Sequence, residues 1–331
     1  MPMAAGLFDD LIGQRQAVAL LMASLERGRL APAYLLAGPH GVGRRLAALR
    51  FLEGVVAGPA GDPALRRRLE AGNHPDLLWV EPTYSHQGRL VPQSQALEAG
   101  VSRRTPPQLR LEQVREVSRF LARRPVEARG CLVVLDGAEA MAEAAANALL
   151  KTLEEPGDGL LLLICAAPEQ LLTTIRSRCQ TVPLGRLEPA ELAQVLQRCA
   201  AAEPLADAAG LTSAPGLDEL AAGSPGALLE HRRQWQQLPA DLTQRLLQLA
   251  QQRGALAGCA PLELLQLASR ISDELEGEQQ LWLLQWWQLL LWRNGGSQAC
   301  VERLNRLRSH LLSYVQPRLA WEVALLDLAG L

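Results

Sequence analysis

The fold is indicated most clearly by residues 33–50, AYLLAGPHGVGRRLAALR. A short apolar run comes first, then a turn built on Gly38, Gly41 and Gly43, then a pattern with mostly Leu, Ala and Arg. An apolar run bounded by glycine is typical of a buried strand, and Leu, Ala and Arg favour a helix. We therefore predict a strand at Ala33–Ala37, a tight turn, and a helix.

Further apolar runs repeat this arrangement along the chain. They lie at Leu77–Val80, Leu132–Leu135, Leu160–Cys165 and Thr181–Leu184. Helical patterns occupy most of the intervals between them. Strands that alternate with helices predict a largely parallel α/β sheet.

Two of the intervening helices can be placed more closely. Leu111, Val114, Phe120 and Leu121 are spaced so that they lie near one face of a helix. Another helix runs from about Ala142 to Glu155. Proline cannot continue a helix and disfavours it in the residue before, so the sequence Pro-Gly at 156–157 ends it.

After Leu184 the strand signal ends and the chain becomes helical. The sequence Glu-Pro-Ala-Glu at 188–191 predicts a helix start, and Gly-Ser-Pro-Gly at 223–226 predicts a break. From about Leu228 the chain is rich in Leu and Gln, with tryptophans as bulky anchors. We predict an α/β domain at 1–185, a small helical domain at 186–228 and a helical bundle at 229–331, with loose segments at 54–61 and 82–107.

Composition limits the classes of function. The 331 residues fit two or three domains. A net charge of −2 leaves only a local patch for nucleic acid, and the candidate residues for it are Arg66, Arg67, Arg68, Arg103, Arg104, Arg123 and Arg124. A solvated face of an arginine-rich protein is the other interpretation of these residues.

Cysteine spacing and hydropathy predict a cytoplasmic protein without zinc or a membrane span. The six cysteines lie far apart, with no C-x-x-C pair. The first 14 residues contain Asp9 and Asp10 where a signal peptide needs a basic and then an apolar run. The most apolar window, Leu281–Trp292, is shorter than the roughly 20 residues that a membrane span needs, so we predict a core helix.

The turn after the first strand has the glycine frame of a phosphate-binding P-loop, at Gly38, Gly41 and Gly43. A working loop continues with Lys, which reaches the phosphates, and with Ser or Thr, whose hydroxyl binds magnesium. Here Arg44 and Arg45 follow. Lys151 is the chain's only lysine, so a change of lysine to arginine at 44 is unremarkable. Arg45 instead puts a fixed positive charge where a magnesium ligand belongs.

A second phosphate-site element ends the strand that begins at Leu132. Asp136 could hold magnesium through water, or it could simply cap the next turn. Gly137 follows it and cannot activate a water molecule as a carboxylate would. Glu139 is acidic, but we expect it to point elsewhere because it lies two residues further on.

Two stretches resemble subunits of the AAA+ clamp-loader family. Residues 144–156, AAANALLKTLEEP, closely resemble a helix of that family, and residues 171–179, LLTTIRSRC, look like its Ser-Arg-Cys segment. Weaker similarities are Ile-Gly-Gln at 12–14, His-Pro-Asp at 74–76 and Gly-Ser-Pro-Gly-Ala at 223–227. The order and spacing agree from Leu7 to about Leu228.

This resemblance implies an AAA+ parallel-sheet domain at 1–185, a helical lid at 186–228 and a helical collar at 229–331. It implies that Arg178 acts as a finger on ATP held by an adjacent subunit, with Ser177 and Cys179 beside it at the interface. Lys151 is either a subunit contact or a helix-solubilising residue. Many relatives carry a four-cysteine zinc module after the P-loop helix, but no cysteine lies between Phe51 and Gly130, so we predict no zinc.

Within the family, the losses favour a subunit that does not hydrolyse ATP. Besides Arg45 and Gly137, the strand that ends at Cys165 continues into Ala166-Ala167, where a motor would usually present Thr or Asn. The lid segment ends Gly-Ala-Leu at 226–228 and has no Arg for the nucleotide. The implied partners are motor subunits of the gamma/tau type with their bound ATP and magnesium, a delta subunit, and, through the complex, the sliding clamp and primed DNA.

Two alternatives stay open at this point. One is a working motor subunit in which Arg44 replaces lysine without loss, and ATP binding by the isolated chain would favour it. The other is a sequence-independent DNA-binding protein that uses the arginine clusters, and a steep salt dependence of DNA binding would favour that.

Overall fold

The structure is a computed structural model, and it describes residues 6–96, 98–101, 106–155, 157–202, 214–251, 256–313 and 315–331. The chain forms two compact units. The first comprises Met1–Glu203 with Gly223–Gly226, and the second comprises Pro204–Ala222 with Ala227–Leu331. The division into three domains stays a prediction. Arg103, Arg104 and Pro156 lie outside the described residues.

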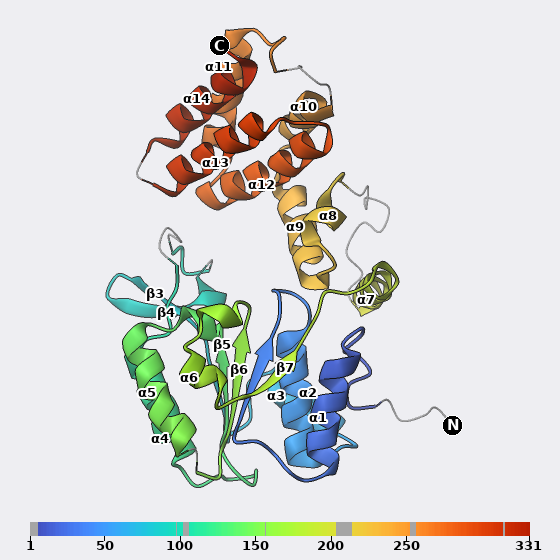
Figure 1. Ribbon diagram of the computed structural model, residues 1–331, viewed down its shortest axis with the longest axis vertical. Coiled ribbons are helices and arrows are strands. Elements are labelled where there is room, and N and C mark those ends of the chain that lie inside the picture. The colour runs from blue at the N-terminus through green and yellow to red at the C-terminus, as the bar shows by residue number, and fades with distance from the viewer. Residues whose placement is uncertain are drawn as a thin grey trace. The chain divides into compact units, whose positions relative to one another are not determined.

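The first unit is built on a five-stranded parallel sheet of order β2-β5-β6-β1-β7 (Figure 1). Its strands are β1 (Ala33–Ala37), β2 (Leu77–Val80), β5 (Leu132–Asp136), β6 (Leu160–Cys165) and β7 (Gln180–Pro183). Each lies within one residue of a predicted apolar run, and the predicted parallel α/β fold is confirmed.

Both faces of this sheet are buried, which explains why its central strands are continuous apolar runs. Successive side chains of a strand point to opposite faces. In β1, Tyr34 and Leu36 belong to one core cluster, whereas Ala33, Leu35 and Ala37 belong to the other. The same alternation runs through β5 and β6.

Helices cover the two faces in groups that are separated in the sequence (Figure 1). The helices that supply buried residues to the first cluster are α1 (Arg15–Glu26), α2 (Arg44–Ala57) and α3 (Pro63–Glu70). Those that supply the second are α4 (Leu111–Leu121), α5 (Glu143–Glu154) and α6 (Thr173–Arg176). Short 3₁₀ turns lie at η1 (Gln93–Gln95), η2 (Ala138–Ala140) and η3 (Pro168–Gln170). Helix α7 (Pro189–Ala202) starts within the predicted Glu-Pro-Ala-Glu segment.

The prediction of loose segments at 54–61 and 82–107 was partly wrong. Helix α2 continues to Ala57, and an antiparallel hairpin forms from β3 (Thr83–His86) and β4 (Arg89–Pro92). Gly88 has φ 76° and Gln87 has φ 49°, so the hairpin turn is left-handed at both residues, as two-residue hairpin loops prefer. With only four residues in each strand, the hairpin has too little alternating pattern to stand out in the sequence.

The second unit is helical, and its helices appear yellow to red in Figure 1. They are α8 (Leu217–Ala221), α9 (Pro225–Gln237), α10 (Ala240–Gln251), α11 (Pro261–Glu274), α12 (Gly277–Arg293), α13 (Gln298–Leu312) and α14 (Pro317–Ala329). Helix α9 begins in the segment that belongs to the first unit. The predicted core helix at Leu281–Trp292 lies within α12, where Trp286 and Trp287 are fully buried.

The buried tryptophans of this unit keep their indole N–H groups hydrogen-bonded. Trp286 donates to the carbonyl oxygen of Pro215 at 3.0 Å, and Trp287 donates to that of Leu246 at 3.1 Å. A buried polar group without a partner is costly, so these bonds help to select one packing of the bundle.

Candidate functional site

The P-loop joins β1 to α2, and its glycines meet specific backbone requirements. Gly41 and Gly43 have φ values of 76° and 99°, which residues with side chains rarely adopt. A Cβ atom at Gly38 would lie 2.1 Å from the carbonyl oxygen of Leu184. The glycine frame is therefore needed to fold this turn, whether or not a phosphate binds there.

Arg44 starts α2 and is directed inward. It is only 8% exposed, and its Nη2 lies 3.0 Å from Nδ1 of His40. Because a guanidinium can only donate, Nδ1 of His40 must accept, and the ring proton is then on Nε2. Burial, followed by the charge of Arg44, lowers the pKa of His40, which agrees with a neutral ring. Nη1 of Arg44 is buried and has no hydrogen-bond partner among the described residues.

Arg45 lies against the acid that would hold magnesium. Its Nη1 is 3.7 Å from Oδ2 of Asp136, and its guanidinium lies 4.3 Å from the ring centroid of Trp79. Burial raises the pKa of Asp136, while the charges of Arg45 and Arg44 act to lower it. Positions 44, 45 and 137 carry neither the hydroxyl nor the second carboxylate of a magnesium-ATP site. In addition, the positively charged guanidinium of Arg45 lies beside Asp136. These residues fit a magnesium ion poorly.

Gly137 is held in a conformation that disfavours a carboxylate side chain. Its φ is 69°, and a Cβ atom there would lie 2.9 Å from Cγ of Pro82. Gly137 also lines a cavity of about 360 Å³, whose other lining residues include Arg44, Asp136 and Glu81. The local backbone therefore disfavours any side chain at 137, including a carboxylate that could activate water.

The expectation that Glu139 points away from this region was wrong. The turn η2 brings the chain back, and Oε1 of Glu139 accepts a hydrogen bond from the backbone N–H of Ala166 at 3.1 Å. Its Oε2 is buried without a hydrogen-bond partner in the described part of the chain. Burial, followed by the charge of Glu139, raises the pKa of Cys165 to about 12. A turn of this kind has no clear sequence signal, which is why the pattern did not reveal it.

The predicted lid segment at 223–226 is hydrogen-bonded to the P-loop. Oγ of Ser224 donates to the carbonyl oxygen of His40 at 2.6 Å, and the N–H of Gly226 donates to that of Gly41 at 2.9 Å. A Cβ atom at Gly226 would lie 2.7 Å from Cα of Gly41. Glycine at 226 therefore permits a close backbone approach, which the sequence did not predict.

Arg178 follows α6, and its guanidinium is held by two hydrogen bonds. Nη1 donates to the carbonyl oxygen of Thr174 at 3.0 Å, and Nη2 donates to Oε1 of Glu154 at 2.8 Å. Ser177 donates its hydroxyl to the same carbonyl of Thr174, at 3.1 Å. Burial raises the pKa of Cys179 to about 11, so this thiol stays protonated near neutral pH.

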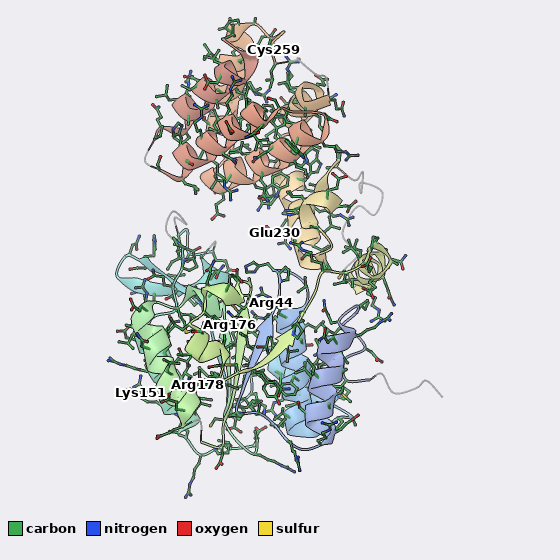
Figure 2. All side chains as sticks on the ribbon, in the orientation of Figure 1. Arg44, Lys151, Arg176, Arg178, Glu230 and Cys259 are labelled. Atoms are coloured by element: carbon green, nitrogen blue, oxygen red, sulfur yellow. The ribbon has the colours of Figure 1, made fainter. Side chains whose placement is uncertain are left out.

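Arg178 does not contact the P-loop. No ion pair or hydrogen bond joins it to residues 38–45 in the described part of the chain. Arg176 and Arg178 come from the α6 end and Lys151 from α5 (Figure 2). Lys151 is exposed and lines a groove of about 940 Å³ between α4 and α5. Neither of the two roles predicted for Lys151 is decided by this position.

Three of the five described arginines of the predicted basic patch contact other side chains of the chain. Arg66 pairs with the fully buried Glu53 at 2.8 Å, and Arg68 pairs with Glu127 at 2.8 Å. Arg123 lies 5.3 Å from the ring centroid of Phe120. Internal pairing reduces the positive charge that is available to a nucleic-acid backbone.

The described residues bear on metal binding and on membrane insertion. No group of three or more His, Cys, Asp or Glu side chains among them could hold a metal ion. Likewise, none of the helices in those ranges is long and apolar enough to cross a membrane.

Comparison with known proteins gives matches along most of the chain. The family model "DNA polymerase III, delta subunit" matches residues 13–188, and the model "Cyanobacterial DNA polymerase III delta prime, C-terminal domain" matches residues 190–328. The chain is 36% identical over 216 residues to DNA polymerase III subunit delta' of Pseudomonas aeruginosa, which covers 62% of this chain and 56% of that protein.

The subunit delta' of Bacillus subtilis is 35% identical over 183 residues, which covers 53% of this chain and 49% of that protein. The chain thus spans about half the length of the curated relatives that it matches. A solved structure of a DNA polymerase III gamma subunit-related protein from Thermotoga maritima covers 95% of this chain and 99% of its own, with a TM-score of 0.51 and 17% identity. That similarity concerns the fold alone.

Proposed function

The chain belongs to the DNA polymerase III delta-subunit family and is a subunit of the delta-prime type, and on this basis we propose that it serves in a clamp loader without hydrolysing ATP itself. In this role it assembles with motor subunits of the gamma/tau type and a delta subunit in the cytoplasm. The complex uses the ATP of the motor subunits to load the sliding clamp onto primed DNA.

The observation that carries the non-hydrolysing role is the position of Arg45 against Asp136. The guanidinium supplies a permanent positive charge beside this acid, at 3.7 Å. A magnesium ion would have to displace that charge or share the acid with it, and two cations close together repel each other. Gly137 adds to this loss, because phosphoryl transfer to water needs a group that orients the nucleophile.

The proposed contribution of this subunit to hydrolysis is Arg178, which we assign as a finger on the ATP of a neighbouring motor subunit. Its side chain is 37% exposed, so part of the guanidinium is accessible to a partner. A fork of N–H donors suits the charge that develops on phosphate oxygens in the transition state.

Two measurements test the proposal. The purified chain should release no phosphate from ATP, and a complex with gamma/tau-type and delta subunits should load clamps onto primed DNA only when this chain is present. Steady hydrolysis by the isolated chain would favour a motor subunit instead. Tight, strongly salt-dependent DNA binding by the chain alone would favour the DNA-binding alternative.

A further inference from the structure

Glu154 is the acid to which Arg178 is bound. It is the last residue of α5, and its Oε1 accepts the hydrogen bond from Nη2 of Arg178 at 2.8 Å. Helix α6 packs against α5, and Arg178, which follows α6, is 24 positions from Glu154 in the chain. The contact therefore depends on the tertiary fold.

The helix dipole does not favour an acid at the C-terminal end of α5, where Glu154 lies. The C-terminal end of a helix carries a partial negative charge from its free carbonyl groups, so an acid there is unfavourable and a base is favoured. Glu154 and Glu155 both lie at this end of α5. Arg178 offsets the unfavourable charge at Glu154.

The bound guanidinium keeps donors for a second partner. A guanidinium has five N–H donors. The hydrogen bonds to Thr174 and Glu154 use two of the five, which leaves three. Arg176, by contrast, forms no ion pair or hydrogen bond through its side chain within the described residues, and it is exposed. Arg178 is thus the one of this pair whose side chain is held in a fixed direction while it stays accessible.

We propose that Glu154 is the positioning residue of the finger: it holds the Arg178 guanidinium so that the remaining N–H donors are directed outward before a neighbour's ATP arrives. This inference rests on the proposed function of Arg178. An arginine side chain has many rotamers, and holding it in one of them beforehand reduces the entropy that is lost when it binds phosphate in the transition state.

The test measures DNA-stimulated ATP hydrolysis by the reconstituted complex with variants of this chain. Glu154→Ala should lower kcat about fivefold with KM for ATP unchanged, because an exposed ion pair is worth up to about 1 kcal/mol and the ATP is bound by another subunit. Glu154→Gln keeps an acceptor oxygen, so it should lose only about twofold. Glu155→Ala removes the neighbouring acid and serves as the matched control, with activity near wild type.

The decisive comparison repeats Glu154→Ala in an Arg178→Ala background. There Glu154→Ala should have no further effect, since the residue on which it acts is absent. Three outcomes would overturn the positioning role and leave the finger intact. Glu154→Ala could cause an equal loss in both backgrounds, or Glu155→Ala could cause a loss equal to that of Glu154→Ala. Alternatively, Glu154→Ala could be fully active while Arg178→Ala is impaired. Wild-type activity of Arg178→Ala would overturn the finger, and the positioning role with it. Assembly of each variant, measured by gel filtration, separates these outcomes from a failure to join the complex.

Discussion

At the scale of single residues, the proposed function depends on two arginines. Arg45 lies 3.7 Å from Asp136, and Arg178 is hydrogen-bonded to Glu154. In the proposed function, a guanidinium opposes magnesium binding at one site and assists a neighbour's ATP hydrolysis at the other. The two sites differ in the acid that each arginine contacts, which is Asp136 for Arg45 and Glu154 for Arg178.

The finger makes the strongest residue-scale prediction. Arg178→Ala should leave assembly nearly intact but lower the DNA-stimulated ATPase and the clamp loading of the complex. Fingers of this kind contribute roughly 10³ to 10⁵ in rate at one site, and a ring with other active sites should lose less in total. Arg178→Lys should rescue little, because an ammonium does not reproduce the planar fork.

The control for this variant is Arg176→Ala, which should matter less. Wild-type activity of the Arg178→Ala complex would reduce the Ser-Arg-Cys segment to a structural similarity.

A second residue-scale prediction concerns the P-loop. Replacing Arg44 with Lys and Arg45 with Thr should restore magnesium-ATP binding at most, because the Asp136 carboxylate is then free of the fixed cation at 3.7 Å. Hydrolysis should stay absent, since Gly137 and Ala166 still lack the required side chains. Calorimetric binding and phosphate release would measure the two effects.

The control is Arg44→Lys alone, which leaves Arg45 beside Asp136 and should bind no better than the parent chain. Turnover by the double variant at a rate typical of motor subunits would contradict this account of the silent site.

At the scale of elements, Asp76 fixes the connection that leads into β5. Its carboxylate accepts hydrogen bonds from the backbone N–H groups of Val126, Glu127 and Ala128 at 2.7, 2.7 and 2.8 Å. The predicted similarity at His-Pro-Asp, residues 74–76, thus has a structural explanation in this chain. Burial acts to raise the pKa of Asp76, but these three donors lower it overall.

Removing this carboxylate should destabilise the first unit. Asp76→Ala removes the common acceptor of three N–H donors in a partly exposed turn, at a cost of about 1 to 3 kcal/mol, and amide hydrogen exchange at residues 126–128 should accelerate. Because the folded pKa is below the unfolded value, the contribution of Asp76 is present above about pH 4 and is lost as the pH falls through the folded pKa. The stability difference between wild type and Asp76→Asn should therefore shrink below about pH 4. A difference that is constant down to pH 2 would contradict the assigned cause.

At the scale of the whole molecule, the two compact units favour a division of labour. The first carries the P-loop and Arg178, the proposed finger, whereas the second is a helical bundle with large apolar side chains at its surface. On α14, Leu319 and Val323 are 51% and 47% exposed and lie four residues apart, on one face of the helix. Exposed apolar surface of this kind is typical of an interface that is buried on assembly.

We expect the segment from about Leu228 to Leu331 to supply most of the assembly energy. A truncation that ends near Leu228 should stay folded, because it keeps the residues of the first unit, but it should fail to join the complex. Circular dichroism would report folding, and gel filtration with the partner subunits would report assembly. Normal affinity of the truncated chain would show that the second unit is not the assembly element.

The parallel sheet, the glycine frame of the P-loop and the side chains missing at 44, 45 and 137 could all be predicted from the sequence. Apolar runs and glycine positions are local properties, and a missing hydroxyl or carboxylate is missing in any fold. Only the tertiary structure showed which groups the long polar side chains contact. Glu139 reaches Ala166, Arg45 reaches Asp136, and Arg178 reaches Glu154. Each contact joins elements that are far apart in the chain, and its direction depends on turns and strand order that spacing does not encode.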